Sequence, residues 1–93
     1  MNFSFPKTRF VDENDSAAQF EHVVSEITEV SMALDNHEPA LRVDEELMDL
    51  FHSLESYFRV KVKEHGPDYV VALRRFVFEK NAARGYYPRL GGK

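Results

Sequence analysis

The sequence predicts an all-α fold, a helical bundle of three to four helices that is completed by oligomerisation and preceded by an extended N-terminal arm. Three observations support this prediction. Apolar residues recur at helical spacing in three long segments, glycine and proline mark the breaks between these segments, and no segment alternates at the strand period. The length of 93 residues indicates a single domain, residues 1–93.

The arm and the first helix come first in the chain. Residues 1–15 are expected to be extended and to be anchored by three phenylalanines, Phe3, Phe5 and Phe10. Ser16, followed three residues later by Gln19, forms a capping-box pattern that predicts a helix start. Apolar residues then keep the helical spacing to about residue 35, and the stretch DNHEPAL breaks the helix.

Two further helices follow within the expected helical core, residues 16–87. Asp44 can cap the second helix, and Gly66 with the proline after it ends this helix. Asp68 can open the third helix, and Gly85 ends it. The remaining residues, 88–93, form a C-terminal tail.

Composition limits the possible classes of protein. The chain has no cysteine, so disulfides and cysteine-based zinc sites are excluded. The net charge of -4, without a block of basic residues, argues against a nucleic-acid partner. No apolar run has the roughly 20 residues that a membrane span requires. The N-terminal stretch MNFSFPKTRF also lacks the apolar core of a signal peptide, so a cytoplasmic protein is expected.

The aromatic content favours an oligomer. Eight phenylalanines and four tyrosines are more than three helices of a 93-residue chain can cover, and Phe76 and Phe78 lie on opposite sides of the third helix. A small core without disulfides also has little stability of its own. We therefore expect a homo-oligomer, a tetramer built as a dimer of dimers or else a dimer.

Two carboxylate pairs occur in the first two helices. Glu26 and Glu29 are separated by one helical turn, and so are Glu46 and Asp49. A short loop makes the two helices antiparallel neighbours, so both pairs can face one groove. A single pair of this kind usually lies on a solvated face of a helix. Two pairs without a nearby lysine repel each other unless a cation joins them, and carboxylate oxygens suit Mg²⁺ or Mn²⁺.

The third helix carries positive charge near its end. Lys80 follows Phe76 by four residues and Arg84 follows Lys80 by four, so both continue the apolar stripe of this helix. The cations can bind phosphate oxygens, and the amide of Asn81 can add a contact. The alternative is that the two side chains extend to solvent at a helix C-terminus, where cations also suit the helix dipole.

These motifs resemble those of the MazG-like nucleotide pyrophosphohydrolases. The likeness rests on Glu26-x-x-Glu29, the spacer of residues 30–45, Glu46-x-x-Asp49 and the later stretch EKNAARGYY, and it covers about residues 20–87. The family implies an oligomeric all-α enzyme that uses Mg²⁺ to split nucleoside triphosphates into monophosphate and pyrophosphate, as in nucleotide-pool house-cleaning.

The resemblance also implies roles for individual residues. Glu26, Glu29, Glu46 and Asp49 would be the metal ligands. Lys80, Asn81 and Arg84 would bind the substrate phosphates, and Lys80 would stabilise the charge that develops during the reaction.

One position departs from the family pattern. Many members have a further Glu, a candidate general base, directly before the first motif, where this chain has Ser25. Here Glu26, or a water held between metal and carboxylate, would have to accept the proton of the attacking water. Two alternatives remain open, a phosphoribosyl-ATP pyrophosphohydrolase and a catalytically silent helical module for assembly or binding.

Overall fold

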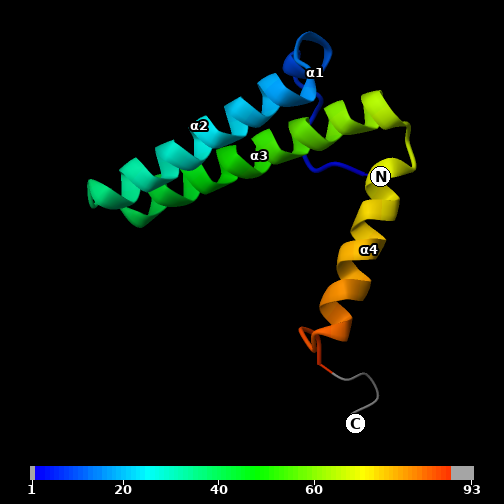
Figure 1. Ribbon diagram of the computed structural model, residues 1–93. Helices are drawn as coiled ribbons and strands as arrows, with labels where there is room; N and C mark the ends of the chain where they lie inside the picture. Colours follow the sequence, from blue (N-terminus) through cyan, green and yellow to red (C-terminus); the bar gives the residue numbers. More distant parts are fainter. Residues whose placement is uncertain (1, 89–93) are drawn as a thin grey trace.

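The computed structural model describes residues 2–88 and shows four α-helices (Figure 1). The all-α prediction is confirmed, and the described residues contain no β-strand. Of the predicted tail, only Pro88 lies within the described residues. Along residues 2–88, no helix combines the length and the apolar character that a membrane crossing needs. The helices are α1 Phe10–Glu13, α2 Ser16–Asp35, α3 Ala40–His65 and α4 Tyr69–Ala83.

The N-terminal segment is only partly as expected. Residues 2–9 lie outside the helices, but α1 forms a short helix within the segment that was predicted to be extended. The backbone N–H of Asn14 closes α1 by bonding to the carbonyl oxygen of Phe10 at 2.8 Å. Val11 is buried on this helix, so α1 adds a contact to the end of α3.

The start of α2 lies where the sequence predicts it, but the cap is different. The side chain of Asp15 accepts a hydrogen bond from the backbone N–H of Ala18 at 2.8 Å and caps the helix. Gln19 does not reach back to the helix start as a capping box would require. Its side chain is fully buried and bonds Asn14 and Ser53 instead.

A tight turn joins α2 to α3. His37 has a φ of 54°, and the next backbone N–H, that of Glu38, bonds the carbonyl oxygen of Ala33 at 3.0 Å. This is the Schellman arrangement, here with a non-glycine residue in the left-handed conformation. The carbonyl oxygen of Pro39 then accepts the first helical bonds, so α3 begins four residues before the predicted cap, Asp44. The predicted start was wrong because the proline already fixes a backbone from which a helix can begin.

Helices α2 and α3 form an antiparallel hairpin (Figure 1). Small apolar side chains line their contact, Val23 and Ala33 from α2 and Val60 from α3, all buried. A polar layer lies among them, where the Gln19 side-chain amide donates to the carbonyl oxygen of Ser53 at 3.3 Å. Apolar periodicity alone does not reveal this layer, which fixes the register of the two helices.

The N-terminal segment is held on α3 by charged side chains. The backbone N–H groups of Ser4 and Phe5 donate to the Glu55 carboxylate, both at 2.9 Å. The Arg59 guanidinium donates to the carbonyl oxygen of Phe5 at 2.8 Å, and the Phe5 ring stacks on His52 with centroids 4.3 Å apart. These contacts place the segment beside the groove between α2 and α3.

Removing the Glu55 charge is expected to loosen this segment. Burial raises the pKa of Glu55, but hydrogen bonds from Ser4 and Phe5 outweigh it and lower the pKa overall. The stability that the Glu55 carboxylate contributes is present above its unfolded-state pKa of about 4.3. It is lost as the pH falls through the folded-state pKa of Glu55. Glu55→Gln should therefore cost about 1 kcal/mol at pH 7 in urea unfolding and speed amide exchange at both N–H groups. Equal stability of the two proteins at pH 7 would contradict this assignment.

Helix α4 leaves the hairpin at an angle (Figure 1). Gly66, with a φ of 99°, ends α3, and the chain turns there as the sequence predicts. The radius of gyration is 16.3 Å, whereas a compact domain of this length has about 12 Å. Much apolar surface is consequently exposed. On α4 it comprises Tyr69, Val71, Leu73, Phe76, Val77 and Phe78.

Candidate metal centre

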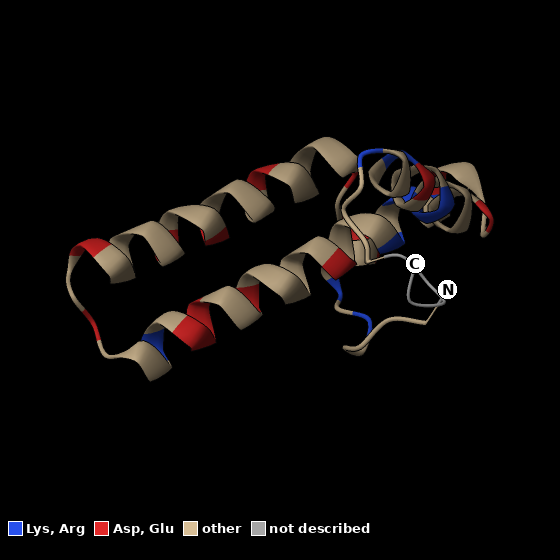
Figure 2. Cartoon of the chain, turned by 90° about the horizontal axis from the view of Figure 1, so that it is seen from below, with Lys and Arg blue, Asp and Glu red and all other residues tan. Residues whose placement is uncertain are grey.

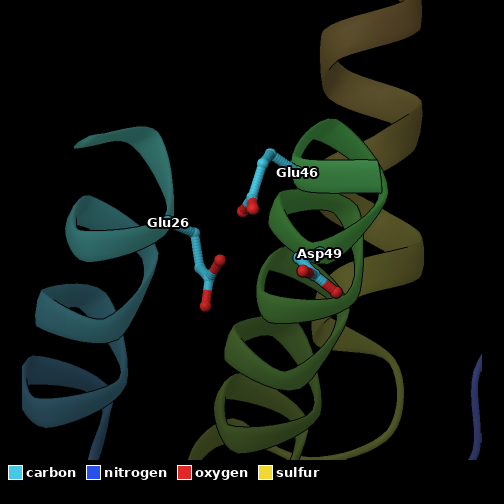
Figure 3. Close-up of side chains that lie close together, drawn as sticks. All are labelled: Glu26, Glu46 and Asp49. Carbon is cyan, nitrogen blue, oxygen red and sulfur yellow. The ribbon is translucent and has the colours of Figure 1, made fainter. Parts of the chain in front are cut away.

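Three of the four predicted metal ligands lie together between α2 and α3. One carboxylate oxygen from each of Glu26, Glu46 and Asp49 lies within 4.8 Å of the others. Figure 3 shows Glu26 reaching from α2 toward Glu46 on α3, with Asp49 beside them on α3. One antiparallel hairpin therefore brings Glu26 to two carboxylates that follow it by twenty or more residues in the sequence.

The hairpin geometry explains this arrangement. Positions three apart share a helix face, so Glu46 and Asp49 both reach the same side of α3. Glu26 meets them because α2 runs antiparallel to α3 beside this face. The side chains of Glu26 and Glu46 are only 20% and 15% exposed, and Asp49 is exposed. The cluster is thus open to solvent on one side and partly desolvated on the other.

The fourth predicted ligand, Glu29, lies apart from this cluster. It is exposed on α2 one turn after Glu26, and its oxygens do not join the group of three within 4.8 Å. Its charge still acts on the site, because it contributes to raising the pKa of Glu26. Glu29 therefore lies at the rim of the cluster.

The proton affinity of Glu26 reflects its surroundings. Burial is the largest cause that raises its pKa, and His22 opposes this shift. The carboxylates of Asp49, Glu46 and Glu29 raise the pKa further by like-charge repulsion. A cation bound among these carboxylates would relieve the same repulsion.

Arg42 is a cation beside the cluster that the sequence analysis overlooked. Its guanidinium donates to the Glu46 carboxylate at 3.1 Å and to Glu45 at 2.9 Å. The signal was present in the sequence, because Arg42 precedes Glu46 by four residues on the same helix. Arg42 is half-exposed and also contacts Glu38, so it holds Glu46 in place without removing the charge of the cluster.

His22 is a second overlooked neighbour. Its Nδ1 lies 2.8 Å from the Ser53 hydroxyl, and its Nε2 lies 3.8 Å from Glu26. The i,i+4 spacing of His22 and Glu26 on α2 could have indicated this contact. Ser25, which stands where the family pattern has a Glu, donates its hydroxyl to the carbonyl oxygen of His22 at 2.7 Å. The Ser25 hydroxyl therefore donates its hydrogen bond to the backbone of its own helix.

A small cavity of about 110 Å³ adjoins the carboxylates. Glu26 and Asp49 form part of its wall, and polar side chains from the N-terminal segment, α2 and α3 form most of the rest. His52 also lines the cavity, and its buried Nε2 has no hydrogen-bond partner within the described part of the chain. The carboxylate cluster thus borders on a polar space. The lining residues are Thr8, Phe10, Gln19, His22, Glu26, Asp49, His52, Ser53 and Ser56.

The predicted phosphate-binding residues lie elsewhere in the single chain. Lys80 and Asn81 belong to the last turns of α4, and Arg84 follows directly. Lys80 and Arg84 are exposed instead of facing inward, because α4 extends away from the hairpin that holds the carboxylates (Figure 1). Within one chain, the structure does not bring these three residues to the carboxylate cluster.

Comparisons with known proteins identified no relative of this chain. No protein family, curated protein or solved structure was found to match the chain.

Proposed function

We propose that the protein is a Mg²⁺-dependent nucleoside triphosphate pyrophosphohydrolase that releases a nucleoside monophosphate and pyrophosphate. The observation that carries this proposal is the convergence of Glu26, Glu46 and Asp49 between two antiparallel helices. The order of the motifs resembles that of the MazG-like enzymes, and this resemblance indicates the class of reaction. Glu29 at the rim would add a fourth negative charge near the ion.

The donor set fits a hard divalent cation. Three carboxylates with oxygens within 4.8 Å of one another offer only oxygen ligands, which Mg²⁺ and Mn²⁺ prefer. The open side next to Asp49 leaves room for water and for phosphate oxygens. When bound, the ion supplies charge neutralisation at the phosphates and acidifies water.

Glu26 is suited to take up the proton of the attacking water. Its carboxylate belongs to the cluster, so it would lie within reach of a water held by the ion (Figure 3). His22, at 3.8 Å, restricts the position of the Glu26 carboxylate. Lys80 and Arg84 would bind phosphate oxygens and offset the charge that develops on the leaving pyrophosphate.

Pyrophosphate release from a panel of nucleoside triphosphates and phosphoribosyl-ATP tests the function. We expect pyrophosphate from one or more nucleoside triphosphates with Mg²⁺ or Mn²⁺. EDTA should abolish the reaction, and Ca²⁺ should support little turnover because its coordination is longer and looser. Product analysis should find monophosphate, because cleavage occurs between the α and β phosphates.

The same panel separates the alternatives. Turnover of phosphoribosyl-ATP alone would identify that pyrophosphohydrolase instead. Absence of hydrolysis for every substrate and metal would favour a silent assembly module, for which the exposed apolar surface would be the functional feature. Full activity in EDTA would show that the reaction does not need a metal ion.

A further inference from the structure

A second cavity, apart from the carboxylate cluster, lies where the N-terminal segment and α1 pack on α3. Its volume is about 340 Å³, and residues from all three parts of the chain line it. It shares no lining residue with the cavity beside the carboxylates. Lys7 and Val11 line this cavity, whereas Thr8 and Phe10 line the other one. The two cavities are therefore distinct candidate sites, and we call this one the N-terminal cavity.

Positive charge dominates the wall of the N-terminal cavity. Among the described residues, the wall has three cations, Lys7, Arg59 and Lys63, and one acid, Asp12, which leaves a net charge of +2. Arg59 and Lys63 are four residues apart and so share one face of α3. Figure 2 shows Lys and Arg mostly toward the end of the molecule that carries the N-terminus, while acidic residues run along the hairpin.

The charges of the two α3 cations are not neutralised within the chain. The Arg59 guanidinium donates to the carbonyl oxygen of Phe5 at 2.8 Å, and the Lys63 ammonium donates to that of Val11. Because a carbonyl oxygen has no net charge, both cations keep theirs, and both have further N–H donors. Within residues 2–88, neither forms an ion pair. Glu55 feels the charge of Arg59, but its carboxylate accepts two backbone N–H groups of the N-terminal segment.

The third cation, Lys7, has a partner that a ligand can displace. Its ammonium lies 3.0 Å from the Asp12 carboxylate, and the two side chains are 50% and 64% exposed. An ion pair this exposed contributes little stability. An anion in the cavity would therefore compete with Asp12 for Lys7 at small cost.

The rest of the wall is apolar and holds Arg59 in place. Phe3, Val11 and Val62 supply this apolar part. The Arg59 guanidinium lies over the Phe3 ring, 4.4 Å from its centroid, and this cation–π contact restricts the orientation of the guanidinium. Cavities that bind small organic molecules have about 300–1,000 Å³. The N-terminal cavity thus has room for an organic group next to an anion.

We propose that the N-terminal cavity binds a phosphomonoester, with its phosphate on Lys7, Arg59 and Lys63 and its organic group against the apolar part of the wall. A phosphomonoester carries about two negative charges at pH 7, because its second pKa is about 6. These charges match the net charge of the wall. The planar fork of an arginine also suits phosphate oxygens.

Such a ligand would connect the N-terminal segment to α3. Lys7 belongs to the segment, whereas Arg59 and Lys63 belong to α3. Because a ligand stabilises the state that binds it, bound phosphomonoester should slow amide exchange at Ser4 and Phe5. The site does not depend on the proposed hydrolysis, although the nucleoside monophosphate that this reaction releases is itself a phosphomonoester.

Binding of phenyl phosphate tests the proposal. The probe combines a phosphate dianion with a flat apolar ring, while phenol and inorganic phosphate each supply one of these parts. Calorimetry and ¹⁵N NMR are carried out in EDTA, so that no metal ion bridges the probe to the carboxylate cluster. We expect saturable binding of phenyl phosphate, weaker binding of inorganic phosphate and none of phenol. The largest shift changes should occur at the backbone N–H groups of Lys7, Asp12 and Lys63.

Two variants of the wall should change the affinity in opposite directions. Lys63→Met keeps an unbranched apolar side chain and removes the charge, so affinity for phenyl phosphate should fall by about tenfold or more. Asp12→Asn removes the competing acid and releases Lys7, so affinity should rise by roughly two- to fivefold. A wall whose cations only hold the N-terminal segment does not account for this rise.

Two substitutions outside the wall are the matched controls. Arg9→Gln removes a positive charge from an exposed side chain of the same segment, and Asp35→Asn removes a negative charge from the far end of α2 (Figure 1). Neither residue lines the N-terminal cavity. Both controls should bind phenyl phosphate as the wild type does.

The proposal is wrong if folded wild-type protein does not bind phenyl phosphate saturably, or if phenol or inorganic phosphate binds equally well. Shift changes confined to the groove between α2 and α3 would place the ligand elsewhere and also overturn it. Lys63 holds the carbonyl oxygen of Val11, so Lys63→Met can act through the fold. Asp12→Asn then decides, because an affinity that does not rise contradicts the site. None of these results depends on hydrolysis, so the proposed function is tested separately.

Discussion

Glu26→Gln is expected to reduce pyrophosphate release by about a hundredfold or more, while the metal-free protein stays at least as stable as the wild type. Loss of a residue that only supports a metal ligand typically costs about 10- to 100-fold, so loss of a ligand should cost at least as much. Glutamine keeps the shape of the side chain and removes its charge. The charge of Glu26 is partly buried and is repelled by Asp49 and Glu46. Its removal therefore relieves this desolvation cost and repulsion in the absence of metal.

The effect on stability depends on pH with a defined sign. The raised pKa of Glu26 means that its contribution to stability is fully present below the unfolded-state pKa of about 4.3 and is lost as the pH rises through the folded-state value. The Glu26→Gln variant has no ionisable group at this position, so it does not lose this stability as the pH rises. In EDTA the variant should therefore be more stable by on the order of 0.5–1 kcal/mol at pH 7, and the difference should vanish near pH 4.

Glu21→Gln is the matched control for this substitution. Glu21 is an exposed glutamate on the same helix and does not belong to the carboxylate cluster. The control should keep wild-type hydrolysis and respond to Mg²⁺ as the wild type does. Glu26 would instead be a structural partner if Glu26→Gln destabilised the metal-free protein, and an ordinary surface charge if the two variants behaved alike.

Lys80→Ala and Arg84→Ala are expected to impair hydrolysis through the substrate and not through the metal. Loss of a charged phosphate contact costs about 1–3 kcal/mol, which corresponds to roughly 5- to 150-fold in kcat/KM. Both residues are exposed in the single chain, so the fold itself should lose little stability. Divalent-cation binding should remain unchanged, because neither residue belongs to the carboxylate cluster.

Arg75→Ala controls for the general charge of α4. Arg75 is exposed on the same helix but lies more than 100° around the helix axis from Lys80, given about 100° per residue. This variant should keep most of its activity. If Lys80→Ala and Arg84→Ala both had wild-type kinetics, these side chains would merely extend to solvent at a helix C-terminus.

Local patterns predicted the three long helices well and the direction of α4 poorly. Apolar spacing, together with the breakers Pro39 and Gly66, was enough to find three long helices, because these signals act within a few residues. The start of α3 was missed by four residues because Asp44 looked like a cap while Pro39 already set the backbone. The direction of α4 depends on the turn at Gly66 and on contacts between helices, which periodicity does not encode.

The candidate site was predictable where it depends on one hairpin. Glu26, Glu46 and Asp49 meet because α2 and α3 are antiparallel neighbours, and a short loop between two helices indicates this arrangement. The separation of Glu29 from them depends on where its side chain points, which residue spacing does not specify. Arg42 could have been found from its spacing, but its simultaneous contact with Glu38, Glu45 and Glu46 required the structure.

Direct measurement of Mn²⁺ binding tests the metal centre most simply. Wild type, Glu21→Gln and Glu26→Gln are titrated with Mn²⁺, the free ion is followed by its electron paramagnetic resonance signal, and Mg²⁺ is then added as a competitor. Wild type and Glu21→Gln should bind Mn²⁺ saturably and release it to Mg²⁺, whereas Glu26→Gln should leave the ion free. Equal Mn²⁺ binding by Glu26→Gln and wild type, or no binding by wild type, would show that these carboxylates do not form a metal centre.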